Sequence, residues 1–589
     1  MKTLNMISWI GAGMLLTSCF NLDRNPEGVL STANPFTTAG EIQNYVNQFY
    51  ETGLRFQGMS AGGGSAICGT DINSDNLAAS SPVTRINGGL SAGSAVELTE
   101  YTYIRNVNYL LANLGNYPDQ AQPAFRQLAG EGYYFRAWYY FQLLQGYGPV
   151  SIVKTPLDPD SEQMKLPRNS RIEVADFIIE DLKTAVEYLQ EQGSSASMRV
   201  HKDVARTLLS EVALFEGTWE KYHKAEGDRF YDSSVTEEKI RGYLQTAADA
   251  AKAVMDRGVW SISTAGGASD AYRSLFATED LSSNPEILWY KRYDGSVVGN
   301  SVDRYLNTGG AGIGVTASLV DDYLTAEGKP FVGELRTSAK AGAYGTEFKS
   351  RDPRLSQTVA VPGQKIHPDG TVLKYSPLAG NGSAYGTNTT GYSLLKHNQI
   401  DYDGNVEAEN KGSTPAIQYR YADVLLNYAE ALAELGGAEH AKEIAAAVKP
   451  LRDRVGMPGM DFDREYNTSS DYPFRSLDKY IQAVRRERRV EQAVEGRRLA
   501  DILRWAAADD LLRGWWPTGA HYSGTDMEEY FKDRTTVLVD SKGDILPLNP
   551  STAAFESGYG FNLDRDYLLP IEERMLSLTS GLWTQNPGW

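Results

Sequence analysis

The sequence predicts a mostly α-helical protein in which antiparallel helix pairs carry a loop-rich region with minor β content. Two observations lead to this prediction. Apolar residues recur at helical spacing from about residue 41 to 260 and again after residue 416. Between these parts, residues 261–415 are crowded with Gly, Ser, Asn and Tyr, which is typical of long loops. The 589 residues are enough to bury a large core.

The N-terminus resembles a bacterial lipoprotein signal. Lys2 gives a short positive start, and residues 6–16 form an apolar stretch that is too short to span a bilayer. This stretch runs into Leu16-Thr-Ser-Cys19, which resembles a lipobox, so we expect a diacylglycerol on the Cys19 sulfur and cleavage before it. Residues 19–40 are interpreted as a tether, because they are rich in Asn, Pro, Thr and Gly. An ordinary secretory signal that happens to contain a cysteine is the alternative.

Four helices are expected in the first helical part. The first carries apolar residues on both faces, should be nearly surrounded by protein, and should end at Gly148-Pro149. Ser170 and Glu173 form an S-x-x-E capping box that should open the second. The third and fourth run through residues 204–215 and 240–254. Helices of this length with modest connections should pack as antiparallel pairs, although no 34-residue consensus repeat is present.

Short strand-like runs interrupt the central loops at Ile287 to Tyr290 and at Thr358 to Val361. After them, one apolar stripe predicts a helix that is closed by Gly436-Gly437. Another long helix is expected from about Leu477 to Leu503. The chain is therefore divided into a signal peptide (1–18), a tether (19–40), an N-terminal helical part (41–260), a loop-rich part (261–415) and a C-terminal helical part with a tail (416–589).

Composition excludes several classes of partner and site. The net charge of −18 argues against a nucleic-acid partner and against electrostatic attachment to anionic lipid. Besides Cys19 only Cys68 is present, so an internal disulfide and a CxxC site are excluded. The six histidines show no HExxH or similar spacing, and neither a metal nor a cofactor is predicted. Tyrosines (35) outnumber phenylalanines (18), which favours wet interfaces and polar ligands.

Two patterns that could indicate an enzyme are interpreted as structural. Ser91 lies in a G-x-S-x-G sequence, but loop residues precede it where a nucleophile elbow needs a buried strand. Glu487, Glu491 and Glu495 share one helix face, close enough to imitate a glycosidase carboxylate pair, but arginines surround them. Neighbouring cations keep carboxylates ionised, whereas a general acid needs a raised pKa. A structural ion network is therefore predicted, and no catalytic residue.

Several segments occur in an order that points to one family. They are Cys19-x-x-Leu22-Asp23-x-x-Pro26, Gly130 to Ala137 with Tyr147-Gly148-Pro149, Leu319-Val320-Asp321, Arg351-Asp352-Pro353-Arg354, Tyr419 to Ala431, Glu487 to Glu491 with Glu495-Gly496-Arg497, and Tyr567 to Ile571. Together they resemble the SusD/RagB family of surface nutrient-binding lipoproteins. Two features depart from the family pattern. Residues 95–99 contain no Trp where the family often has one, and Pro450 is expected to interrupt a helix that usually continues.

The resemblance implies a mostly α fold with degenerate tetratricopeptide-like helix pairs that face a partner. It also implies a loop-rich face that holds the ligand. The implied partner is a SusC-like TonB-dependent β-barrel, and the implied location is the outer membrane, at the cell surface. Ligands of the family are usually glycans and less often peptides, so we expect a binding protein rather than an enzyme.

Ligand contacts are predicted from residue type. Sugars present C–H faces to aromatic rings and hydroxyls to Asp, Asn and Arg, and such groups are expected on loops. The predicted contacts are Asp71, Asp75, Asn76 and Arg85 from the loop at 69–89, and Tyr293, Tyr305, Tyr344 and Tyr385 from the central loops. Three alternatives stay open: a surface-anchored glycan hydrolase, a peptide-binding uptake lipoprotein, and a structural or adhesive lipoprotein.

Overall fold

The computed structural model describes residues 34–58, 66–157, 165–193, 197–307, 312–367, 369–378, 387–401, 407–553 and 555–589. The predicted signal peptide, Cys19, most of the tether and Tyr385 lie outside the described residues. The first helix begins within the predicted tether, at Ala39, and Phe36 just before it is buried in the core.

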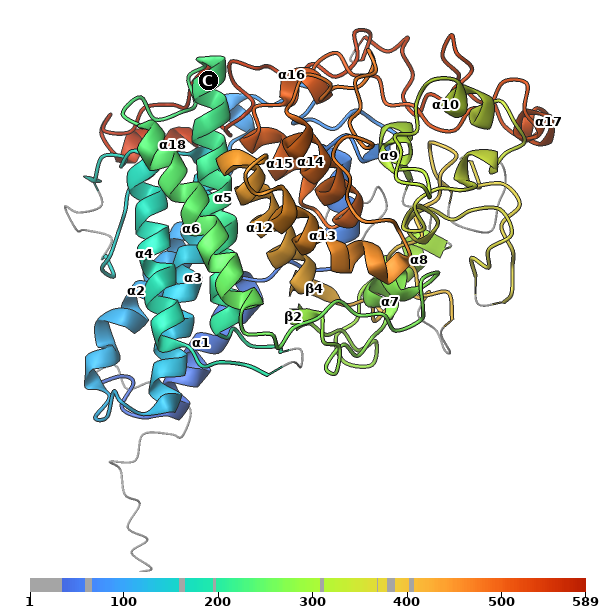
Figure 1. Cartoon of the computed structure of the whole chain (residues 1–589). Coiled ribbons are helices and arrows are strands. Elements are labelled where there is room, and N and C mark those ends of the chain that lie inside the picture. Colours follow the sequence, from blue (N-terminus) through green and yellow to red (C-terminus); the bar gives the residue numbers. More distant parts are fainter. Residues whose placement is uncertain are drawn as a thin grey trace, which may run out of the picture.

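A body of paired helices forms one side of the molecule (Figure 1). Its helices are α1 (Ala39–Thr52), α2 (Glu100–Asn113), α3 (Pro123–Tyr147), α4 (Arg171–Tyr188), α5 (Lys202–Glu226) and α6 (Glu237–Met255). Each helix from α2 to α6 packs against the next along the chain, as predicted for antiparallel pairs. The predicted capping box opens α4, where the Glu173 N–H donates to Ser170 Oγ at 3.3 Å and the Ser170 N–H donates to Glu173 Oε2 at 2.8 Å.

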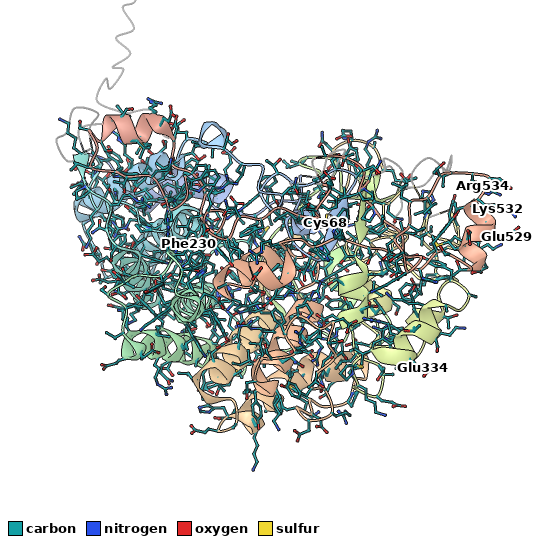
Figure 2. The ribbon with its side chains drawn as sticks, turned by 90° about the horizontal axis from the view of Figure 1, so that it is seen from above. Cys68, Phe230, Glu334, Glu529, Lys532 and Arg534 are labelled. Carbon is teal, nitrogen blue, oxygen red and sulfur yellow. The ribbon has the colours of Figure 1, made fainter. Side chains whose placement is uncertain are left out.

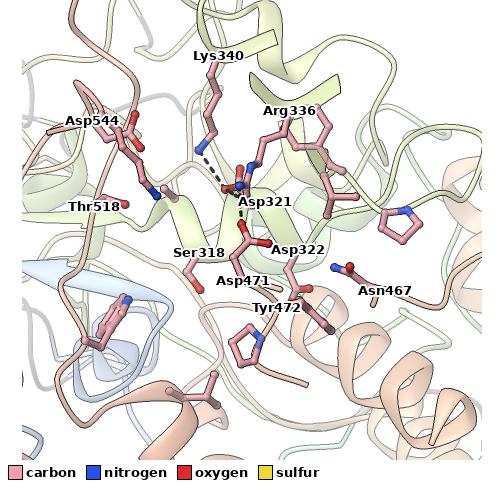
Figure 3. Close-up of a pocket in the computed structure, with 18 of the residues that line it drawn as sticks. Ser318, Asp321, Asp322, Arg336, Lys340, Asn467, Asp471, Tyr472, Thr518 and Asp544 are labelled. Carbon is pink, nitrogen blue, oxygen red and sulfur yellow. Dashed lines mark hydrogen bonds and ion pairs between the residues drawn. The ribbon is translucent and has the colours of Figure 1, made fainter. Parts of the chain in front are cut away.

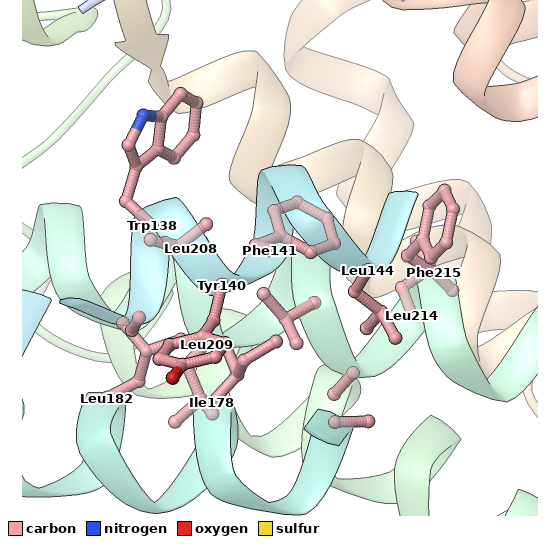
Figure 4. Packing of buried hydrophobic residues seen from close by; sticks show 14 of the residues in the cluster. Trp138, Tyr140, Phe141, Leu144, Ile178, Leu182, Leu208, Leu209, Leu214 and Phe215 are labelled. Atoms are coloured by element: carbon pink, nitrogen blue, oxygen red, sulfur yellow. The ribbon is translucent and has the colours of Figure 1, made fainter. Parts of the chain in front are cut away.

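Helix α3 is the centre of this body, and it is buried on nearly every side, as predicted. Tyr140, Phe141 and Leu144 of α3 pack into one apolar cluster with residues of α4 and α5 (Figure 4). Glycine lets α3 approach the end of α4 closely, since a Cβ at Gly130 would lie 2.8 Å from Leu189 Cγ. The helix ends at Gly148, whose φ of +70° a residue with a side chain rarely adopts.

The loop-rich region is joined to the helical body by short strand pairs. Its elements are β1 (Leu77–Ala79), β2 (Ile287–Lys291), β3 (Ile313–Val315) and β4 (Ala416–Arg420), with short helices α7 (Ala271–Ala277), α8 (Val302–Asn307), α9 (Ala317–Asp322), α10 (Gly333–Lys340) and α11 (Leu355–Thr358). Strands β1 and β3 pair antiparallel, as do β2 and β4. The predicted strand at Ile287 to Tyr290 is confirmed as β2. The one at Thr358 to Val361 is wrong, because residues 355–358 form α11 and only Val359 makes a bridge, to Leu394.

The C-terminal helices are α12 (Tyr421–Gly436), α13 (Ala441–Val455), α14 (Lys479–Glu491), α15 (Arg498–Arg504), α16 (Ala508–Leu511), α17 (Asp526–Phe531) and α18 (Glu573–Leu578). The predicted helix from Leu477 to Leu503 is therefore two helices. Val494 and Gly496 between them have φ of +63° and +71°, and left-handed residues end a helix. The expected interruption at Pro450 is also wrong: α13 continues through it, and the buried apolar face of α13 compensates for the lost hydrogen bond.

A buried ion network holds α13 and α14 against β4 and the loop-rich region. Glu491 lies 2.7 Å from Arg420, 2.6 Å from Arg454 and 2.9 Å from Arg354. Burial by itself raises the pKa of Glu491, but these three guanidinium groups outweigh it and hold the pKa well below its usual range. Arginines lower the pKa of Glu487 in the same way, and Arg420 with Lys396 lowers that of Glu495. The structural interpretation of the three glutamates is confirmed.

Two further features concern membrane-spanning helices and the buried cysteine, Cys68. None of the described helices is both long enough and apolar enough to cross a membrane. Cys68 lies inside the molecule (Figure 2), and burial raises the pKa of its thiol well above the usual range.

Candidate functional site

A cleft of about 650 Å³ lies where the loop-rich region meets the C-terminal helices (Figure 3). Helices α9 and α10 line it from the loop-rich region. Residues 467–474, α14, the start of α15, residues 510–521 and residues 540–544 line it from the C-terminal part. The cleft therefore exists only because the fold brings segments together that are far apart in the sequence.

Two ion pairs hold α10 across the cleft. The Lys340 ammonium lies 3.0 Å from Asp321 Oδ2, and Arg336 Nη2 donates to Asp471 Oδ2 at 2.6 Å (Figure 3). Burial lowers the pKa of Lys340, but the charge of Asp321 outweighs this effect and the pKa is raised. Burial raises the pKa of Asp471, but its bond to Arg336 outweighs that and the pKa is lowered. Lys340 and Asp471 are therefore charged at neutral pH.

Arginines form a second wall of the cleft. Arg489, on α14, lies 2.9 Å from Asp322 and 2.9 Å from Asp75. Arg498, at the start of α15, lies 2.7 Å from the same Asp75. Arg486 lies one turn before Arg489, on the same face of α14, and it also lines the cleft. This wall is thus rich in fixed hydrogen-bond donors.

Aromatic rings supply the apolar part of the lining. Trp515 and Trp516 are half-buried and lie next to each other in the loop after α16. Each is supported from behind, because Trp515 stacks on Tyr559 at 5.8 Å between ring centroids and Trp516 meets Phe555 edge-on at 5.0 Å. Tyr472, Phe474 and Phe331 complete the aromatic lining. Rings that are fixed in this way can contact a ligand with little loss of side-chain entropy.

The lining can donate and accept hydrogen bonds as well as contact apolar faces. Nη1 of Arg486 and Nη1 of Arg498 are buried and have no hydrogen-bond acceptor among the described residues. Asp321 Oδ1 is likewise buried without a donor. Buried polar groups without partners are uncommon in proteins and require an explanation. A ligand that carries both donors and acceptors would satisfy all three.

Three residues predicted to bind ligand are buried structural groups. Asp71 accepts hydrogen bonds from Asn76 Nδ2 and from the Val494 N–H, both at 2.9 Å, and burial raises its pKa to about 6. Asn76 Oδ1 accepts from Arg489 Nε at 3.0 Å. Asp75 bridges Arg489 and Arg498, as described above. They attach β1 and the segment before it to α14 and α15, and Asp75 and Asn76 touch arginine side chains of the cleft.

The other predicted residues are dispersed, and none of the described ones lines the cleft. Arg85 donates to the Tyr567 carbonyl at 3.4 Å, and burial lowers its pKa to about 10. The buried Tyr293 hydroxyl accepts from the Gln57 N–H at 3.1 Å. Tyr305 donates to Glu409 at 3.3 Å, and Tyr344 donates to the Gly391 carbonyl at 2.8 Å. Sequence reasoning missed the cleft residues, although the adjacent Trp515-Trp516 in a loop is a signal that could have pointed to it.

Metal binding has no structural support in the part of the chain that the structure describes, where no three His, Cys, Asp or Glu side chains are grouped as metal ligands. The carboxylates of the cleft are mostly paired with cations. Asp510 differs, because burial and, after it, the neighbouring Asp509 raise its pKa.

Comparison with known proteins gives consistent results along the chain. A model of the SusD family matches residues 278–589, which is more than half of the chain. A second model, described as starch-binding and associating with the outer membrane, matches residues 97–214. A SusD-like protein of Formosa agariphila is 23% identical over 599 residues, and the alignment covers 99% of each chain. A second SusD-like protein of that organism is 22% identical and covers 72% of this chain and 76% of its own.

Solved structures share the fold. A SusD-like carbohydrate-binding protein of Bacteroides fragilis superimposes with a TM-score of 0.72 at 20% identity, covering 93% of this chain and 99% of its own. A laminarin-binding SusD-like protein gives a TM-score of 0.54 at 18% identity, covering 94% of this chain and 100% of its own. At these identities the likeness establishes the mostly helical fold.

Proposed function

The chain belongs to the SusD family, and from this premise we propose that it binds an oligosaccharide in the cleft between α9, α10 and α14. The bound sugar is then passed to a SusC-like TonB-dependent transporter in the outer membrane. A lipid on Cys19 anchors the protein at the cell surface beside that transporter. In this proposal the protein is a binding protein and not an enzyme.

The single observation that carries the proposal is the composition of the cleft wall. Trp515 and Trp516 offer flat apolar surfaces, and Arg486, Arg498 and Asp321 each offer one polar atom that has no hydrogen-bond partner among the described residues. A sugar ring has both features, since its C–H face packs on an indole and its hydroxyls donate and accept. A purely apolar ligand would leave the polar atoms unsatisfied.

The residues predicted from sequence keep a smaller part in the proposal. Tyr305 and Tyr344 are half-buried in the loop-rich region, and Arg85 lies in the loop at 69–89. We propose them as outlying contacts for a chain longer than the cleft. Asp75 and Asn76 would act indirectly, by fixing Arg489 and Arg498.

Isothermal titration of the mature protein against a panel of oligosaccharides tests the proposal. Trp515→Ala and Trp516→Ala should each weaken binding at least about 5-fold, because an aromatic contact contributes about 1 kcal/mol beyond the area it buries. Tyr530→Ala on α17 is the matched control, since its ring is 38% exposed and does not line the cleft. Binding that survives both tryptophan changes would exclude the cleft as the sugar site. Tight binding of peptides alone would favour the peptide-uptake alternative.

Asp510 lines the cleft, and burial and the neighbouring Asp509 raise its pKa above the ordinary value, which is the direction that a general acid of a second candidate, a glycan hydrolase, would need. Release of reducing ends from a polysaccharide, abolished by Asp510→Asn with sugar binding retained, would establish it. Binding without any product release would leave the transport proposal as it stands.

A further inference from the structure

Resting on the proposed oligosaccharide binding, we propose that the cleft selects an anionic sugar, one that carries a carboxylate or a sulfate ester. Arg486, Arg498 and Lys542 are the residues that recognise the negative group. The proposed ligand is thus an anionic oligosaccharide, and its negative group binds on the arginine side of the cleft.

The three arginines of this wall are unequally paired with carboxylates. Arg486, Arg489 and Arg498 all line the cleft. Arg489 and Arg498 share Asp75, and Arg489 also pairs with Asp322. Arg486 is left 3.7 Å from Glu465 and 3.9 Å from Asp322.

Glu465 cannot neutralise Arg486 fully, because it already accepts from Arg452 at 2.6 and 2.9 Å. Arg452 in turn shares Glu487 with Arg354. Arg489 and Arg498 are thus closely paired with Asp75 and Asp322, whereas the ion pairs of Arg486 are longer, at 3.7 and 3.9 Å. A guanidinium does not lose its proton at physiological pH, so a bound anion would complete the pairing of Arg486.

Two buried arginine nitrogens of this wall have no hydrogen-bond acceptor among the described residues. Arg486 and Arg498 are 4% and 3% exposed, and Nη1 of each has no hydrogen-bond partner among the described residues. Leaving a buried charged donor without an acceptor is unfavourable. A carboxylate or sulfate supplies both the acceptor oxygen and the charge. Because both nitrogens are buried, the side chains must move for a ligand to reach them.

Acidic side chains also line the cleft, and two of them form ion pairs with cations there. Asp321 and Asp471 pair with Lys340 and Arg336. Asp540 accepts the backbone N–H groups of Lys542 and Asp544. Asp321 and Asp471 are therefore engaged by cations of the cleft and repel an approaching anion less than unpaired carboxylates would.

Lys542 adds a cation at the accessible edge of the cleft. Its side chain is exposed, and its ammonium group has no ion-pair partner in the part of the chain that the structure describes. An exposed cation attracts an approaching anion and raises the rate of association, an effect that salt weakens. The buried arginines and the exposed lysine therefore act at successive stages of binding.

Titration with three oligosaccharides of equal length tests the inference: a neutral one, one built of uronic acids and one carrying sulfate esters. The mature protein should bind at least one anionic oligosaccharide about 10-fold more tightly than the neutral one, and less tightly as NaCl is raised. Lys542→Gln should reduce this preference several-fold and leave the affinity for the neutral sugar unchanged. Arg486→Gln alters a residue that is also proposed to contact sugar hydroxyls, so it should weaken binding of both sugars, and of the anionic one several-fold more. Lys532→Gln, directly after α17, changes an exposed cation outside the cleft and is the matched control (Figure 2).

The outcomes separate this inference from the function on which it rests. Equal affinity for neutral and anionic sugars, or a preference that both variants retain, overturns the inference and leaves sugar binding intact. Failure of the wild type to bind any oligosaccharide overturns the proposed function itself. Because Arg486 is buried, its variant is checked for folding by circular dichroism. Lys542→Gln is exposed and decides the question even if Arg486→Gln does not fold.

Discussion

Burial can change the protonation state of an individual residue from the one that its chemical type suggests, and Glu220 is an example. It lies on α5 with Glu216, and both share Arg171, at 2.9 Å from Glu216 and 3.8 Å from Glu220. Burial and, after it, the neighbouring Glu216 raise the pKa of Glu220 to about 8, although the charge of Arg171 opposes them. One arginine cannot balance two buried carboxylates, so the pair retains a proton near neutral pH.

This pair predicts a pH dependence of stability. Because the pKa of Glu220 is higher in the folded state than the ordinary value of 4.5, its stabilising effect is present below pH 4.5 and is lost as the pH rises toward about 8. Glu220→Gln should therefore raise the melting temperature relative to wild type at pH 8 and change it little at pH 4.5. Thermal unfolding from pH 4.5 to 8.5 checks this, with the exposed Glu187→Gln of α4 as control. A constant difference across the range would contradict it.

The candidate site shows the limit of predicting single residues. Asp71, Asp75, Asn76 and Tyr293 are residue types that suit a sugar, but the structure buries all four and occupies their polar atoms. Residue type indicates what a side chain can bind, and only the fold decides what can reach it. The Trp515-Trp516 pair was visible in the sequence, but nothing local distinguishes a ring that lines a cleft from one in the core.

At the scale of elements, sequence patterns predict those helix starts, buried faces and helix ends that depend on neighbouring residues in the chain. The Ser170–Glu173 box, the apolar stripes of α3 to α6 and the glycine end of α3 depend on neighbouring residues, and each was predicted. The break between α14 and α15 depends on distant ones. Asp71 accepts the Val494 N–H at 2.9 Å, and Lys396 donates to the Ala493 carbonyl at 2.7 Å. These contacts fix a left-handed residue that the helical pattern of the segment did not reveal.

Helix α10 provides a prediction at this scale. None of its side chains is buried, so the ion pairs of Arg336 with Asp471 and of Lys340 with Asp321 hold it over the cleft. Partly exposed ion pairs contribute about 0–1 kcal/mol each, which is enough to alter local opening without unfolding the protein. Asp471→Asn should speed amide hydrogen exchange in residues 333–340 and weaken ligand binding several-fold.

The matched control for α10 is Glu334→Gln. Glu334 is exposed on the same helix and points outward at the edge of the molecule (Figure 2). Exchange that stays unchanged in Asp471→Asn, or that rises equally in both variants, would mean that the ion pair does not hold the helix.

For the whole molecule, the sequence predicted the class of fold but not the place of the cleft. One apolar cluster includes residues from Phe36 to Trp583, so the N-terminal and C-terminal helices share a core. The cleft needs residues 317–341 beside residues 467–544. No pattern within either segment shows that the other lies beside it, because that arrangement follows from the packing of the entire chain.

The proposed anchor gives the prediction at this scale. Two or three acyl chains hold a protein on a membrane, at about 0.8 kcal/mol for each buried CH₂ group. Cys19→Ser should therefore move the protein from the outer-membrane fraction to the soluble fraction and abolish labelling by a fatty-acid analogue. It should leave oligosaccharide affinity unchanged, since the cleft is built from residues after 316. Recovery of the variant in the membrane fraction without label would argue for attachment through the transporter alone.

The pairing of β2 with β4 has a consequence for how such a protein can diversify. Because the two strands are hydrogen-bonded to each other, residues 292–415 begin and end at the same place beside the helical body. Closing a longer or shorter excursion costs little extra, since the entropic term grows only with the logarithm of length. The segment that carries α9 and α10 can therefore change in length and sequence, and with it one wall of the cleft, while the packing of the helical body stays the same.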